Sequence, residues 1–161
     1  MSITAAHPLT PESIAEQILQ DFWDKSLPVD PVKIAVKMGI KVFSSLSLET
    51  SGQLLVDESG RKIIKFLRSE PLVRQRFTVA HELGHVCCGH GPRNRTDNSG
   101  YSLFNFDPVE RDANMFAAAL LMPEPAIAHF LDIGASLQGM AAKFCVSERA
   151  MQIRLEKLGV V

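Results

Sequence analysis

The chain has 161 residues, of which 46% are hydrophobic and 22% are charged, and its formal net charge at pH 7 is -1. This size and balance fit a soluble globular protein with one sizeable core. They argue against a disordered chain or a dedicated DNA-binding module, because either would carry a large excess of one charge. No apolar run is long enough to span a membrane, and the first residues lack the features of a secretion signal. The three cysteines, an odd number, are typical of free thiols in a reducing compartment, so we expect a cytoplasmic protein without membrane association.

The first half of the chain predicts two helices followed by a small sheet. Thr10 and Asp30 each precede a proline, and a capping side chain before a proline at the first helical position is typical of a helix start. Short apolar runs then predict three strands, the last two joined by a turn at 57–60. We expect helices at 11–19 and 31–38 and strands at 40–43, 53–56 and 62–67. The strands are expected to form a small antiparallel sheet.

The second half of the chain predicts two long helices and a helical tail. Apolar residues with a helical period begin near Pro71 and end near Gly89 or Gly91. The segment 92–106 is polar, then aromatic, and lacks a period, so it is expected to be a functional loop. A second long helix is expected at 107–122, where Pro123 and Pro125 close it, and short helices are expected at 137–144 and 147–158.

The first long helix contains an H-E-x-x-H motif, formed by His81, Glu82 and His85. Residues four apart share a helical face, with Cβ atoms about 5 to 6 Å apart, so both imidazoles can bind one ion. Glu82 lies about 100° further round the helix, where its carboxylate can reach a water on the metal as a general base. Chance placement would give the motif in roughly one such chain in a hundred, but residues 78–87 are otherwise uncharged, as a buried site requires.

A catalytic zinc usually has three protein ligands, and the candidate for the third is Glu110, at the start of the second long helix. An alternative is that Asp107 and Glu110 form a capping box, in which the glutamate serves the backbone. The small alanines at 117–119 favour the ligand role, because they would let this helix approach Gly84 closely. Asn114, one turn after Glu110, is well placed to orient a ligand histidine.

Two further side chains near the motif are alternatives to this ligand set. Cys88 follows His81 by seven residues, and a thiolate there would close the site and make it structural. Gly89 indicates that the helix is already ending, so Cys87 and Cys88 are expected to pack in the core. His90 is a weaker candidate ligand or a group that polarises water.

Two blocks, RFTVAHELGH at 76–85 and ERDANMFAAALLMP at 110–123, resemble the ImmA/IrrE family of zinc-dependent metallopeptidases. The similarity extends from about residue 14 to residue 123, and the two blocks with their spacing are more specific than H-E-x-x-H alone. Family members are cytosolic bacterial or phage-borne proteases that cut a helix-turn-helix repressor or antitoxin and so release transcription. The resemblance therefore implies a metalloendopeptidase whose partner is such a protein substrate.

The resemblance also implies which residues form the site. His81, His85 and Glu110 would hold one zinc ion per chain, with manganese as the alternative metal, in a gluzincin-like site with Glu82 as catalytic base. Candidates for stabilising the oxyanion or contacting substrate are Tyr101, the single tyrosine, and His90. The expected fold is α+β, with the sheet packed on a zincin-like helical core over 1–132 and a helix-turn-helix-like pair over 133–161 packed on it.

The helical tail offers a second class of function. Its segment 139–155 resembles half of a DNA-reading module, with Ser147 as the cap of the second helix. Charged residues from 143 to 157 show only a weak basic excess, so direct nucleic-acid binding is not expected and packing on the catalytic domain or gripping a repressor is favoured. The rival hypothesis is a non-catalytic protein that binds a regulator or DNA and carries a structural or vestigial zinc site.

Overall fold

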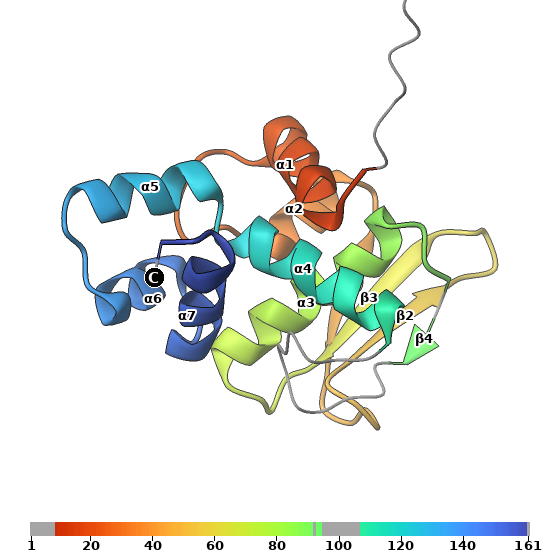
Figure 1. The fold of residues 1–161 in the computed structure, drawn as a ribbon. Coiled ribbons are helices and arrows are strands. Elements are labelled where there is room, and N and C mark those ends of the chain that lie inside the picture. The colour runs from red at the N-terminus through yellow and green to blue at the C-terminus, as the bar shows by residue number, and fades with distance from the viewer. Residues whose placement is uncertain (1–8, 92, 95–106, 161) are drawn as a thin grey trace, which may run out of the picture.

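The fold is α+β, as the sequence predicts (Figure 1). The structure, a computed structural model, describes residues 9–91, 93–94 and 107–160. The helices in this part of the chain are α1 (Pro11–Phe22), α2 (Pro31–Lys37), α3 (Leu72–Cys87), α4 (Pro108–Leu121), α5 (Glu124–Asp132), α6 (Leu137–Phe144) and α7 (Glu148–Lys157). The strands are β1 (Lys41–Ser45), β2 (Gly52–Val56), β3 (Lys62–Leu67) and the short β4 (Arg93–Asn94).

The sheet is mixed, which corrects the prediction of an antiparallel sheet. Its strand order is β1-β3-β2-β4, and β3 is antiparallel to β2 but parallel to β1. The turn at 57–60 joins β2 and β3 as a hairpin, as expected, whereas the segment 46–51 carries the chain past β3 before β2 begins. The strand order follows from that longer connection, because only a tight turn requires two consecutive strands to pair directly.

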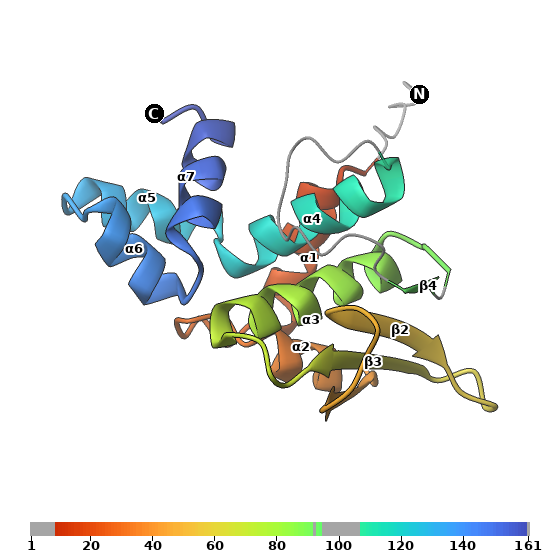
Figure 2. The ribbon, with the colours of Figure 1, turned by 90° about the horizontal axis from the view of Figure 1, so that it is seen from below.

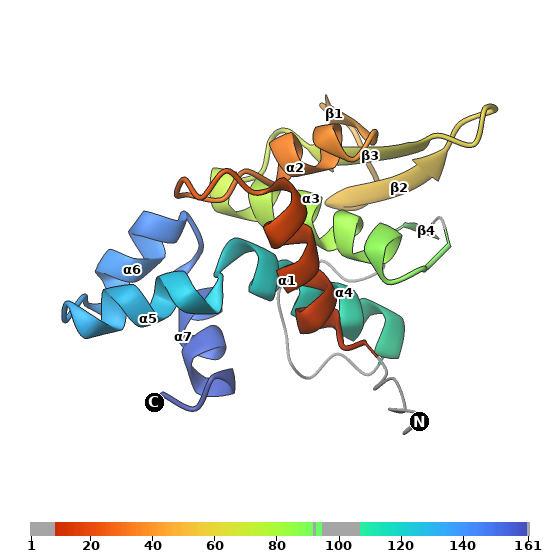
Figure 3. The ribbon, with the colours of Figure 1, turned by 90° about the horizontal axis from the view of Figure 1, so that it is seen from above.

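The motif helix α3 lies at the centre of the molecule. It packs on β2 and β3 on one side and on α4 on the other (Figure 2), and α1 packs against α4 (Figure 3). Large side chains from all these layers join one apolar core, among them Leu54, Ile64, Leu83 and Phe116. Every side chain on α3 near this centre is therefore shielded from solvent by the sheet or by α4.

α1 and α2 begin at the capping side chains that the sequence predicts, and the structure contains one further helix, α5. Thr10 accepts a hydrogen bond from the Ser13 N–H at 3.1 Å, and Asp30 accepts one from the Val32 N–H at 3.0 Å. The sequence does not predict α5, because the prolines at 123 and 125 by themselves indicate only the end of α4. Both fall at the cap and in the first turn of α5, where a missing N–H costs nothing.

The C-terminal helices gather at the end of the molecule away from the sheet (Figure 3). Two arginines tie them to the rest of the chain. Arg76 of α3 donates to the carbonyl oxygens of Val29 at 2.6 Å and Cys145 at 3.2 Å, and Arg154 of α7 donates to the Met122 oxygen at 3.1 Å. Apolar side chains of α6 and α7 belong to the same buried cluster as those of α1 to α4.

Within the residues that the structure describes, no helix combines the length and the hydropathy needed to cross a bilayer.

Candidate metal centre

The two histidines of the motif face each other in the interior of the molecule. His81 and His85 are both fully buried on α3, and their Nε2 atoms lie 3.1 Å apart. Their ring planes are nearly perpendicular, at 87°, so the two Nε2 atoms point toward one region from different directions. The one-turn spacing along α3 produces this convergence.

Glu110 completes the group from the first turn of α4. One of its carboxylate oxygens lies 2.8 Å from His81 Nε2, and the other lies 3.2 Å from His85 Nε2. The cap of α4 is provided by Asp107, which accepts from the Val109 N–H at 2.9 Å. The carboxylate of Glu110 is therefore directed at the imidazoles, as the ligand hypothesis requires.

The histidines also set the charge of Glu110. Burial by itself would raise the pKa of this carboxyl, but hydrogen bonds and charge interactions with His81 and His85 outweigh burial and hold the pKa well below its ordinary value. Glu110 is thus an ionised carboxylate at neutral pH, which is the form that binds a cation.

The described residues contain one group of side chains that could bind a metal ion together. Its members are His81, His85 and Glu110. One candidate ligand atom from each lies within 4.8 Å of the others, and all three residues are buried. Cys88 is not part of the group. Burial, together with the nearby charges of Asp112 and Glu12, raises the pKa of its thiol to about 11, so it stays protonated at neutral pH.

Asn114 lies behind His81, on the side away from this group. Its Oδ1 is 2.8 Å from His81 Nδ1, and the amide is buried with 2% of its surface exposed. Because the amide oxygen can only accept, His81 Nδ1 must carry the hydrogen and donate it. With Nδ1 occupied in this way, Nε2 is the nitrogen of His81 that faces Glu110 and His85.

Glu82 occupies a different face of α3, toward the start of β2. Its side chain is fully buried and lies against Gly52. A Cβ atom built on Gly52 would be 3.1 Å from Glu82 Oε1 and would collide with the methyl group of Thr78. Sequence analysis did not single out Gly52, although a glycine at the first position of a strand can indicate a close approach of the backbone to another group.

The start of β2 is held in place by a polar cluster. Ser51 donates to Glu70 at 3.0 Å, Arg74 pairs with the same glutamate at 2.6 Å, and the Ser51 carbonyl accepts from the Leu67 N–H at 2.9 Å. Ser51 is itself buried. Because Arg74 belongs to α3, the cluster links the residue before Gly52 to the helix that carries Glu82.

The other predicted residues fall outside the group. His90 lies beside His85, with 2.9 Å between their Nδ1 atoms, and Tyr101 lies outside the described residues. Burial, followed by the neighbouring Cys88, raises the pKa of Cys87 to about 12, and both cysteines pack against the apolar core as expected. Protonated thiols of this kind are poor nucleophiles.

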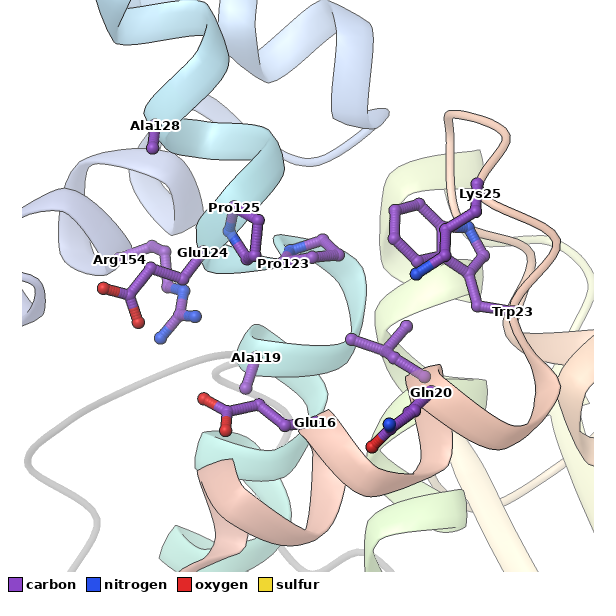
Figure 4. A pocket seen from close by; sticks show the side chains of 11 residues that line it. Glu16, Gln20, Trp23, Lys25, Ala119, Pro123, Glu124, Pro125, Ala128 and Arg154 are labelled. Atoms are coloured by element: carbon purple, nitrogen blue, oxygen red, sulfur yellow. The ribbon is translucent and has the colours of Figure 1, made fainter.

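A cavity of about 530 Å³ lies elsewhere, between α1, the beginning of α5 and α7 (Figure 4). Trp23 and Lys25 stand on one side of it, and Arg154 and Glu124 on another. His81, His85 and Glu110 are not among the residues that line this cavity. The cavity is therefore separate from the candidate metal centre.

Comparison with known proteins gives a family for this chain. The model of the Peptidase M78 family, described as the IrrE N-terminal-like domain, matches residues 35–156. The chain belongs to this family. The resemblance visible in the sequence is thereby confirmed, and the match to the IrrE N-terminal-like domain runs on from the H-E-x-x-H motif through α5, α6 and most of α7.

Two individual proteins are also similar. The radiation response metalloprotease IrrE of Deinococcus radiodurans is 43% identical over 61 residues, which are 37% of this chain and 19% of that protein. A solved structure described as a Mycobacterium tuberculosis transcriptional regulator has a TM-score of 0.65 at 16% identity, over 91% of this chain and 46% of that one. The second likeness shows a shared fold. The chain spans less than half the length of either protein.

Proposed function

We propose that this chain is a zinc-dependent metalloendopeptidase that hydrolyses a peptide bond in a regulatory protein. The observation that carries the proposal is the buried convergence of His81, His85 and Glu110, with Glu82 one position along the same helix. Membership of a peptidase family supports the same reaction, as does the identity with a protein described as a metalloprotease.

The donor set fits zinc. Two imidazole nitrogens and one carboxylate oxygen are ligand types of catalytic zinc sites, which use three protein ligands and leave one position for water. Two of the donors are arranged as a metal requires, since Asn114 occupies Nδ1 of His81 and so leaves Nε2 as its ligand atom, and Glu110 is ionised. The same donors suit manganese, so zinc is the proposed metal and manganese the alternative.

Glu82 is the residue that we assign to proton transfer. A zinc ion in this centre would polarise the scissile carbonyl and lower the pKa of the attacking water. The carboxylate of Glu82 would take the proton from that water and return it to the leaving amine. Because the side chain is buried between α3 and the start of β2, its carboxylate is positioned before substrate arrives. Tyr101 and His90 are kept as candidates for contact with the oxyanion or the substrate.

The substrate that we propose is a helix-turn-helix repressor or antitoxin, whose cleavage would relieve transcriptional repression. This choice rests on the sequence resemblance to the ImmA/IrrE family. Direct contact with DNA is not part of the proposal. The exposed charges of α7 balance, with Glu148 and Glu156 against Arg149 and Lys157, and Arg154 is buried on the Met122 carbonyl. Duplex binding normally needs a basic surface.

The function is tested with the purified chain and the helix-turn-helix regulator encoded beside its gene. We expect one zinc per chain by elemental analysis, cleavage of the regulator, loss of cleavage on chelation and recovery when zinc is returned. Cleavage that resists a strong chelator would contradict the metal mechanism. Salt-sensitive binding to duplex DNA without any proteolysis would instead support the rival DNA-binding hypothesis.

Gly52→Ala is expected to slow peptide hydrolysis by about 10²-fold, because the added methyl group would push Thr78 and Glu82 from their positions and a displacement of about 1 Å has that cost. Zinc binding should persist, since the atoms nearest to the added methyl group belong to Thr78 and Glu82 rather than to the ligand residues. The measurement is kcat/KM beside a zinc titration. Gly91→Ala is the control, because among the described residues a methyl group there meets no atom within 4 Å. An unchanged kcat/KM in Gly52→Ala would show that Glu82 does not depend on this contact.

A further inference from the structure

The end of α3 places a third histidine against the motif. The helix ends at Cys87, Cys88 is its cap, and Gly89 has a φ of 78°, in the left-handed region that glycine adopts without strain. The Gly89 N–H then donates to the Val86 oxygen at 3.2 Å, and the His90 N–H donates to the His85 oxygen at 2.8 Å. This pair of bonds is the Schellman motif, which brings the residue after the glycine back over the last turn of the helix.

The side chains of His85 and His90 meet as well. Their Nδ1 atoms are 2.9 Å apart, with ring centroids 5.1 Å apart and planes inclined at 59°. His85 is fully buried, and His90 is half-buried beside it. Backbone and side chain of His90 therefore both bind the same residue of the motif.

The contact requires one particular arrangement of hydrogens if His85 is to bind a metal. Two ring nitrogens at 2.9 Å share a single hydrogen, so one Nδ1 donates and the other accepts. A metal ligand needs the lone pair on His85 Nε2, which faces His81 and Glu110, and this leaves the hydrogen on His85 Nδ1. His90 Nδ1 must then be the acceptor.

The arrangement is parallel to that of the other histidine ligand. His81 donates from Nδ1 to the side chain of Asn114, one turn after Glu110 on α4. His85 has His90 in the corresponding place, supplied by the cap of its own helix rather than by a neighbouring one. Partners of this kind orient the ring, select the tautomer and make the ligand more basic.

We propose that His90 is a positioning residue for the metal centre: it accepts the Nδ1 hydrogen of His85 and so holds His85 in the tautomer and orientation that bind the ion. The proposal rests on the proposed function for the identity of the metal site. It assigns His90 a place behind a ligand and adds a partner for His85 that matches Asn114.

The test compares His90→Leu, which removes the acceptor, with His90→Asn, whose Oδ1 can accept in nearly the same place. Zinc affinity of the full chain is measured by competition with a chelating indicator. We expect His90→Leu to bind zinc about 10 to 100-fold more weakly than the parent chain and His90→Asn to recover most of the loss. The control is His129→Leu, which removes an exposed histidine from α5 and should leave the affinity unchanged.

Nitrogen NMR of the metal-free chain gives a second, independent readout. The parent protein should show a hydrogen on His85 Nδ1 that is hydrogen-bonded to His90, and His90→Leu should lose this hydrogen bond. Equal zinc affinities in all the variants, or a parent chain without a hydrogen on His85 Nδ1, would overturn the proposal. A parent chain that binds no zinc would refute the proposed function, while the NMR measurement would still decide the role of His90.

Discussion

Glu82→Gln is expected to reduce peptide hydrolysis by about 10² to 10⁴-fold while leaving zinc bound, because the amide keeps the shape of the side chain but cannot accept a proton. The glutamine would still fit beside Gly52, so the ligand residues His81, His85 and Glu110 should not move. The measurement is single-turnover cleavage of the regulator by chain loaded with one equivalent of zinc. Elemental analysis of the same samples shows whether the metal is retained.

The control for this variant is Glu58→Gln, an exposed glutamate in the turn between β2 and β3. It makes the same chemical change away from the centre and should cleave at the parent rate. A Glu82→Gln chain that holds zinc and cleaves as fast as the parent would remove Glu82 from the role of base. A variant that loses the metal would instead place Glu82 among the groups that hold it.

Gly84→Val is expected to lower the free energy of unfolding by about 3 kcal/mol, since overpacking a tight helix crossing costs energy of this order. A Cβ on Gly84 would lie 3.0 Å from the Ala113 oxygen and 3.1 Å from both Ala113 Cα and Phe116 Cδ1. Two of these atoms are main chain and cannot rotate away, so α3 and α4 would have to separate. Because the ligand residues lie on both helices, zinc affinity should fall as well.

Urea denaturation of the metal-free chain measures the free energy of unfolding separately from metal binding. Gly139→Val is the matched control, because Gly139 is an exposed helical glycine in α6, and the one atom outside its own helix backbone that its added Cβ would approach within the described part of the chain is the Ser136 hydroxyl, at 3.1 Å. Its stability should change by less than about 0.5 kcal/mol. Equal stabilities for the two variants would mean that α3 and α4 tolerate a wider separation.

The crossing of α3 and α4 depends on contacts that the sequence pattern of either helix does not predict. The alanines at 117–119 predict a close approach of this helix to Gly84, but the atoms nearest to Gly84 belong to Ala113, one turn before Ala117, and to Phe116. Helical period predicts which residues share a face, but the register of two packed helices depends on all the side chains between them. Similarly, α5 was missed because a proline ends one helix or begins the next according to its neighbours in space.

The amino-acid sequence by itself determined the features that depend on neighbours along the chain. These include the capped starts of α1, α2 and α4, the hairpin of β2 and β3, and the placing of two imidazoles one turn apart on α3, because caps, turns and helical faces are set within a few residues. The family resemblance in two blocks of sequence added Glu110 as the expected third member of the group.

Only the tertiary structure decided what depends on distant segments. It made β1 parallel to β3, brought the carboxylate of Glu110 to both imidazoles, placed Gly52 against Glu82 and set His90 behind His85. The physical reason is that each of these contacts joins elements whose distance is fixed by the packing of the whole core rather than by local backbone preference.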